Sequence, residues 1–442
     1  MTDALATDAD KIGLQRVLGL LEVTASGVGI IIGAGIYVLL GPATAVAGGT
    51  VWAAFLLAAI LCGLTGLSYA ELSSMFPRAG GEYEYARQVA PEPVAFVVGW
   101  TMTGGLVIAA AAISLGFARY LQSFVDLPVR VGAWGLLVVV GLIELVGIRR
   151  ASWLVVALGA VQVGGLVVVI VSGLGHLGET DLLAGNGFDG IVGGAALVFF
   201  AFIGFDEVIT LAEETRNPSR TVPKALMLAL GLSAALYAMV AVAAVSVLPP
   251  DELGRSSRPL ADVVTHVLGP SAVRGMAMVA VLTTINTTLL VVTAASRLVF
   301  GMADRGSLPG RLRGVNRRGA PWVAVVVVCC GAAVFVGVGN LTAIAGATDF
   351  AVYVVFLAVN VVLIVLRVRR PDVDRPFKVP GRIGPVPVLP ILAIAATLVM
   401  IPQLGFESLL LGAGIVVAGG IAASVRGMVR RAWDQRQAKP AP

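Results

Sequence analysis

Glycine gathers in one apolar stretch near the start of the 442-residue chain. Gly27, Gly29, Gly33 and Gly35 lie within nine residues, and each weakens an α-helix by roughly 1 kcal/mol relative to alanine. A helix that breaks here frees backbone amides and carbonyls, which hydrocarbon tolerates only where they are buried in protein or line a wet cavity. Close packing of two helices through Gly29 and Gly33 is the alternative interpretation.

A second apolar stretch carries two adjacent acids. Asp206 and Glu207 follow the run 199–205, in which Gly204 is the one glycine. An acidic side chain at membrane depth is costly and marks a pathway or a binding site by default. Both carboxyls can also bind and release a proton.

The composition of the chain decides the environment of both stretches. Hydrophobic residues make up 58% of the chain and charged residues 13%, and the mean hydropathy is +0.94. A soluble domain averages about 45–50% apolar and about 25% charged residues. The sequence therefore predicts an all-α polytopic membrane protein. Its net charge of +5 follows from basic loops, so we expect no nucleic-acid partner.

Twelve segments are apolar and long enough to be candidate membrane helices, which need about 20 residues each. The connections between them are short, so no loop could hold an independent soluble domain. The predicted spans cover 18–47, 51–76, 94–122, 131–148, 152–175, 190–212, 225–248, 272–302, 322–338, 341–366, 386–403 and 408–425.

The basic residues predict the orientation of these spans. With a cytoplasmic N-terminus, the inside segments carry 26 Lys and Arg residues and the outside segments carry 5. An even number of spans makes 1–17 and 426–442 cytoplasmic tails. Spans 1 and 6 then enter from opposite faces, as a five-plus-five inverted repeat requires. The two repeats are predicted over 18–175 and 190–366, and two extra helices over 386–425.

Ordered motifs along the chain resemble those of one family of membrane proteins. They are 68–72 and 77–83 around the end of span 2, 200–206 in span 6, and 370–372 and 375–377 before span 11. By these motifs the chain resembles the amino acid–polyamine–organocation (APC) superfamily of transporters. The last two motifs resemble its bacterial cationic amino acid transporter branch.

The resemblance implies a secondary transporter in which helices 1 and 6 are broken around a central substrate. Carried over by motif position, the amides of Ala34 and Gly35, beside Gly33, would hold the carboxylate of an amino acid. The carbonyl of Ile31 would accept from the substrate ammonium. The corresponding groups of span 6 belong to Phe200, Ala201, Ile203 and Gly204.

Coupling and gating residues are less closely defined by the resemblance. A proton-coupled subset of the family has a lysine midway along span 5, where this chain has Gln162, whose amide does not titrate. Proton coupling would then fall to Asp206, Glu207 or Asp349. Sodium is the less favoured ion, because the hydroxyl groups of 283–288 can bond back to their own helix. Phe200 or Phe202 could gate the site.

Span 3 lacks the acid that some cationic carriers have, so we expect a neutral L-amino acid as the substrate. A cationic amino acid, a polyamine or amine, and an exchange reaction are the alternatives. An intramembrane enzyme is disfavoured because no nucleophile–base pair or metal motif occurs, and a primary pump because no nucleotide-binding motif occurs. A channel is disfavoured because the interrupted pair of spans fits alternating access better. The two histidines are isolated, and none of the three cysteines has CxxC spacing or a nearby histidine pair, which predicts no metal site and no cofactor. We expect a monomer or weak homo-oligomer in the plasma (inner) membrane, with Glu71 in a structural ion pair.

Overall fold

The structure is a computed structural model that describes the backbone of residues 18–76, 81–146, 152–316, 319–384 and 386–437. Side chains are described in the same ranges except 152–156, 210–214 and 429–437. The predicted tail 1–17 and the last five residues of the tail 426–442 lie outside the described residues.

Helices make up nearly the whole described chain, in agreement with the predicted all-α membrane protein. Within it, nine helices are long and apolar enough to cross a membrane, and a pair bent by 48° makes a tenth span. The bent pair is α1 (Leu20–Ile31) and α2 (Ala34–Ala47), and two shorter apolar helices are α13 (Trp322–Val338) and α15 (Val388–Met400). The nine are α3 (Val51–Met75), α5 (Glu92–Leu121), α6 (Val129–Val146), α7 (Ser152–Gly173), α8 (Gly187–Val198) with its continuation to Ile209, α9 (Pro218–Val247), α12 (Ala272–Asp304), α14 (Leu341–Arg369) and α16 (Phe406–Gln437). Each of the twelve predicted spans therefore falls on helical structure.

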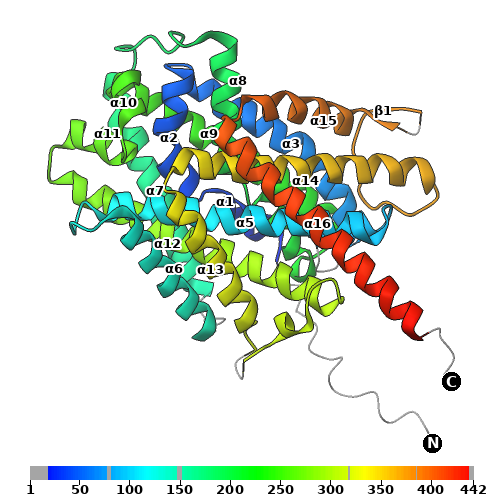
Figure 1. The fold of residues 1–442 in the computed structure, drawn as a ribbon. Coiled ribbons are helices and arrows are strands. Elements are labelled where there is room, and N and C mark those ends of the chain that lie inside the picture. Colours follow the sequence, from blue (N-terminus) through cyan, green and yellow to red (C-terminus); the bar gives the residue numbers. More distant parts are fainter. Residues whose placement is uncertain (1–17, 77–80, 147–151, 317–318, 385, 438–442) are drawn as a thin grey trace, which may run out of the picture.

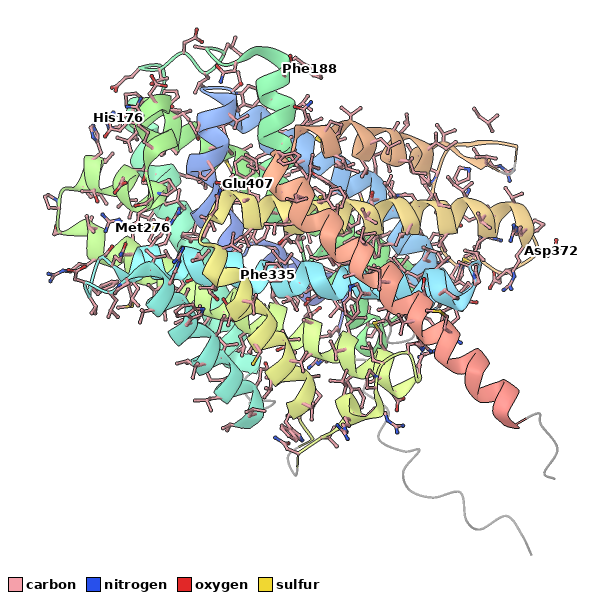
Figure 2. The ribbon with its side chains drawn as sticks, viewed as in Figure 1. His176, Phe188, Met276, Phe335, Asp372 and Glu407 are labelled. Atoms are coloured by element: carbon pink, nitrogen blue, oxygen red, sulfur yellow. The ribbon has the colours of Figure 1, made fainter. Side chains whose placement is uncertain are left out.

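Short helices and one hairpin lie in the connections between these long helices. They are α4 (Gly81–Arg87), η2 (Leu174–His176), α10 (Pro250–Arg255), α11 (Pro259–Leu268), η5 (Gly310–Arg313), η6 (Ile401–Gln403) and the hairpin of β1 (Arg382–Ile383) with β2 (Val386–Pro387). His176 and Met276 lie towards the left of Figure 2, whereas Asp372 lies at its far right.

Several helices that are five places apart in the order of spans pack against each other. In span 6, α8 is followed by η3 (Phe199–Phe202) and η4 (Phe205–Glu214). Helix α2 packs on α8, α1 on η4, α3 on α9, and α5 on α12. Helix α5 crosses the middle of the bundle, where it also contacts α6, α13, α14 and α16 (Figure 1). The five-plus-five inverted repeat itself stays a prediction.

Large apolar side chains are exposed along the outer helices. Val138 on α6, Val334 on α13 and Ile421 on α16 are at least 60% exposed. A soluble monomer rarely exposes contiguous apolar surface on this scale. Contact with lipid chains accounts for this surface, since hydrocarbon solvates such side chains without cost.

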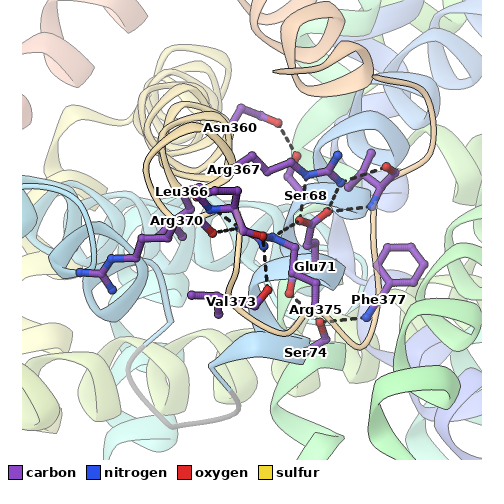
Figure 3. A network of polar contacts seen from close by, with 12 residues as sticks. Ser68, Glu71, Ser74, Asn360, Leu366, Arg367, Arg370, Val373, Arg375 and Phe377 are labelled. Carbon is purple, nitrogen blue, oxygen red and sulfur yellow. Dashed lines mark hydrogen bonds and ion pairs between the residues drawn. The ribbon is translucent and has the colours of Figure 1, made fainter. Parts of the chain in front are cut away.

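A row of polar side chains joins α3 to α14. Thr65, Ser68 and Glu71 recur at every third position of α3 and so lie on one face of the helix. The amide of Asn360 on α14 donates to Thr65 Oγ1 over 3.1 Å. Its Oδ1 accepts from the Ser68 hydroxyl over 2.7 Å (Figure 3). The pairing removes polar groups from hydrocarbon on both helices.

Glu71 is the charged end of this row and is fully buried. Its Oε1 accepts from Arg367 Nε over 2.9 Å and lies 3.4 Å from Arg375 Nε, and its Oε2 pairs with Arg367 Nη2. The backbone amide of Val379 donates to Oε2 over 2.7 Å (Figure 3). The predicted structural ion pair of Glu71 is confirmed, and two arginines take part in it.

Replacement of Glu71 by alanine is expected to destabilise the protein strongly. The change leaves two guanidinium groups buried without their anion, which costs about 3–5 kcal/mol. Thermal unfolding in detergent should show a large fall in the midpoint. The matched control is Glu92→Ala, because that carboxylate pairs with Arg426 over 2.7 Å but is 37% exposed. The control should lose less than about 1 kcal/mol of its free energy of unfolding. Equal losses of stability in the two variants would contradict a special role for the buried pair.

Candidate functional site

Span 1 is broken where the glycines predict it. Helix α1 ends at Ile31 and α2 begins at Ala34, and the backbone of Gly33 between them is extended. Gly29 has open space around its Cα, so an added Cβ would meet nothing within 4 Å. The alternative interpretation, close helix packing through both Gly29 and Gly33, is therefore wrong at Gly29.

Span 6 is broken by a different device. After α8 the chain tightens into η3, Ile203 is extended, and η4 starts at Phe205. Between them Gly204 has a φ of +107°, which residues with a Cβ rarely adopt. The lone glycine of this span thus permits the reversal that ends one half-helix and begins the next.

The two breaks lie face to face. A Cβ added to Gly35 would come within 2.7 Å of Ala201 Cβ and closer still to its Cα. A Cβ added to Gly204 would lie 3.6 Å from the carbonyl oxygen of Ile30. The predicted substrate-binding groups of the two spans therefore meet at one place in the bundle.

Tyr237 of α9 bridges the breaks and was not predicted from the sequence. Its buried hydroxyl lies 2.9 Å from the carbonyl oxygen of Ile31 and 3.0 Å from that of Ala201. One hydroxyl proton can be donated to only one of these carbonyls at a time. The sequence feature that could have indicated this role is that Tyr237 is a lone tyrosine in an apolar span.

Thr287 of α12 completes the contacts at span 1. Its Oγ1 accepts from the amide of Ala34 over 3.1 Å and donates to the carbonyl of Thr283 over 2.9 Å. The hydroxyls of Thr284 and Thr288 also donate to carbonyls four residues earlier. The expectation that these hydroxyls bond back to their own helix is confirmed for all three.

A small cleft lies beside the breaks. Leu106 of α5 and Leu290 and Val291 of α12 form its apolar wall, and the acidic residues Asp206 and Glu207 also line it. Ile30, Ile203, Gly204 and Thr287 complete the lining. The cleft holds about 30 Å³ of space accessible to water, which is room for one water molecule but not for an amino acid. The structure is therefore closed around the breaks.

The phenylalanines of span 6 pack inward and do not line the cleft. Phe202 is fully buried, with its ring centroid 5.1 Å from that of Tyr237, and Phe200 is also buried. A gating role for either ring stays a prediction. The contact with Tyr237 shows that movement of Phe202 has to disturb the bridge between the breaks.

Two coupling candidates lie outside the cleft. Asp349 on α14 is fully buried, and neither carboxyl oxygen has a hydrogen-bond partner among the described residues. Gln162 on α7 is 1% exposed, its side chain lacks a partner among the described residues, and its backbone carbonyl accepts from the Tyr37 hydroxyl over 2.7 Å. Asp206 and Glu207 thus line the cleft beside the breaks, whereas Gln162 and Asp349 do not.

Two broken spans that face each other inside a polytopic helical bundle are a feature of secondary transporters. The sequence profile of the family described as amino acid permease matches residues 18–422. The branched-chain amino acid permease BcaP of Bacillus subtilis is 30% identical, and 92% of each chain is aligned. The methylthioribose transporter of that bacterium is 29% identical over 88% of this chain and 89% of its own. Vacuolar cationic amino acid transporter 2 of Arabidopsis thaliana is 31% identical over 81% of this chain and 61% of its own.

The chain belongs to the amino acid permease family. The resemblance to APC transporters is thereby confirmed. The relatives of the chain are named as transporters and not as enzymes.

The close approach of the breaks predicts different outcomes for two glycine substitutions. Gly35→Ala forces α2 away from Ala201, and we expect loss of transport together with a lower thermal midpoint. Gly29→Ala is the matched control on the other side of the break. Its added Cβ meets no atom within 4 Å, so this variant should keep normal transport and a normal thermal midpoint. Uptake and thermal unfolding measured on the same preparations test this. Normal uptake by Gly35→Ala would place the breaks further apart than the structure has them.

Proposed function

We propose that the protein is a secondary transporter that moves an L-amino acid across the plasma (inner) membrane by alternating access. The observation that carries this proposal is the Tyr237 hydroxyl, which lies within 3.0 Å of carbonyls from both breaks. Those carbonyls, of Ile31 and Ala201, are positioned to accept from one small donor. An ammonium group has three donors and would satisfy both at once.

The contacts of Tyr237 and Thr287 at the breaks are the ones that the substrate would replace. Its ammonium would take over the carbonyls that Tyr237 now occupies, and its carboxylate would take the Ala34 amide from Thr287. The amide of Gly35 follows on the same half-helix, whose N-terminus favours an anion. In the closed structure the Thr287 hydroxyl accepts from the Ala34 amide, and the Tyr237 hydroxyl donates to one of the two carbonyls, so these groups keep partners when the substrate leaves.

The walls of the cleft favour a neutral, aliphatic substrate. Leu106, Leu290 and Val291 present only hydrocarbon, and one relative is named a branched-chain amino acid permease. A cationic amino acid is the second candidate, because Asp206 and Glu207 line the same cleft and other relatives are named cationic amino acid transporters.

Uptake of radiolabelled amino acids into proteoliposomes tests both the function and the substrate. We expect leucine, isoleucine or valine to compete with uptake at least tenfold better than arginine or lysine, a difference of about 1.4 kcal/mol. Stronger competition by arginine or lysine would reverse the assignment, and the absence of any amino acid uptake would remove the proposed function.

The predicted orientation belongs to this proposal. Both termini would be cytoplasmic, and 18–175 and 190–366 would be the two inverted repeats. Cysteines placed at Asn340 and at Arg313 should then react with a membrane-impermeant maleimide from opposite faces, Asn340 from outside and Arg313 from inside. Reaction of both from one face would be incompatible with that topology.

A further inference from the structure

An apolar groove lies between α7 and α9, away from the substrate site. It holds about 250 Å³ of space, compared with about 30 Å³ in the cleft beside the breaks. Its lining residues are all apolar and come from α7, from the turn that follows it and from α9: Ile170, Gly173, Leu174, Leu177, Ala238, Met239, Val242 and Ala243.

The groove is closed where its two helices touch and open towards the surroundings of the bundle. A Cβ added to Gly173 would lie 2.5 Å from the Cβ of Ala243, so small residues let α7 and α9 meet there. The larger lining side chains point outward, since Leu174 is 58% exposed, Leu177 51% and Met239 48%. An occupant therefore enters the groove from outside the bundle.

The surroundings of the groove are hydrocarbon, because α7 and α9 both belong to candidate membrane spans. A bound water needs two to four polar partners, and no side chain of the lining offers one. An empty groove forfeits the dispersion contacts of its lining. An acyl chain supplies those contacts and is the hydrocarbon at hand in a bilayer.

Polar side chains lie just beyond one end of the groove. His176 ends η2, two residues after Leu174, and its Nδ1 lies 3.0 Å from Glu179 Oε2 (Figure 2). The ring of His266 on α11 follows at a centroid distance of 6.5 Å from that of His176. The Glu179 side chain is 63% exposed. A carboxylate beside imidazole N–H donors matches the ammonium and the phosphate of a zwitterionic headgroup.

We propose that the groove between α7 and α9 binds one acyl chain of a zwitterionic phospholipid, whose headgroup lies at His176, Glu179 and His266. In the predicted orientation this end of both helices faces outside, so the lipid comes from the outer half of the bilayer. This lipid site goes beyond the proposed transport function and does not depend on it.

Helix α9 links the groove to the breaks. Ala238 lines the groove and directly follows Tyr237, whose hydroxyl contacts the carbonyls of Ile31 and Ala201. An acyl chain seated against α7 and α9 stabilises the position of α9 from which Tyr237 reaches both carbonyls. Because the groove exists only in the folded protein, the bound lipid also raises the thermal midpoint.

Lipid retention by the purified protein tests the groove. Ala238→Phe places a ring in the groove, and native mass spectrometry should show the fraction of protein that carries phosphatidylethanolamine falling about tenfold. Ala235→Phe is the matched control, because Ala235 is exposed on the same helix and outside the lining. Added phosphatidylethanolamine should raise the thermal midpoint of the wild type and of the control, but not that of Ala238→Phe. Equal retention by the two variants would overturn the proposal.

Photolabelling of the wild-type protein in proteoliposomes needs no variant. Phosphatidylethanolamine with a diazirine in its acyl chain should label the peptides of Leu174 and Met239 more strongly than those of Val138 and Ile421, which are at least 60% exposed. Uniform labelling would show only bulk lipid contact and would overturn the proposal, as would a cross-link to a second copy of the chain through these peptides.

Competition in the same experiment tests the headgroup. Unlabelled phosphatidylethanolamine should reduce the labelling of Leu174 and Met239 more than phosphatidylglycerol does, and equal competition would refute the headgroup assignment. All of these measurements are made without substrate. A protein that takes up no amino acid but binds the lipid would therefore refute the proposed function alone.

Discussion

Backbone groups without helical partners are the constraint around which this membrane protein is arranged. Each broken span exposes amides and carbonyls at a depth where water cannot solvate them. One tyrosine hydroxyl serves the carbonyls of Ile31 and Ala201, and one threonine hydroxyl serves the amide of Ala34. Helices α9 and α12 therefore hold their positions because the breaks in spans 1 and 6 require their side chains.

The two breaks use different local chemistry to reach the same place. Span 1 needs a small residue at Gly35 because Ala201 approaches it closely, and its extended segment has an ordinary φ. Span 6 needs a glycine at position 204 because the backbone itself takes a positive φ. A side chain at Gly35 would push the halves apart, whereas a side chain at Gly204 would strain the chain within one half.

Helical spans and both breaks could be predicted from the sequence because they depend on local features. Apolar length predicts a span, and Gly33 and Gly204 mark where a helix weakens. The partners of the freed groups could not be predicted, since Tyr237 and Thr287 reach the breaks only through the packing of distant spans. The full burial of the Asp349 carboxyl could not be predicted for the same reason. Glu71 was assigned to an ion pair, but Arg375 as its second partner depends on the course of the loop after α14.

The ion pair between α3 and α14 also has a consequence for the order in which the molecule is assembled. Glu71 and Arg367 are separated by 296 positions, and seven predicted spans are synthesised between their helices. Until α14 arrives, α3 carries a carboxyl, a threonine and a serine without their final partners, and a lone acid in a membrane helix costs about 2.5–3.5 kcal/mol. The second span to be synthesised thus gains the partners of its polar side chains only when the tenth span is in place. A chain that stops short of Arg367 leaves an unsatisfied acid in its first third. The stability of the early spans therefore depends on whether synthesis reached the late ones.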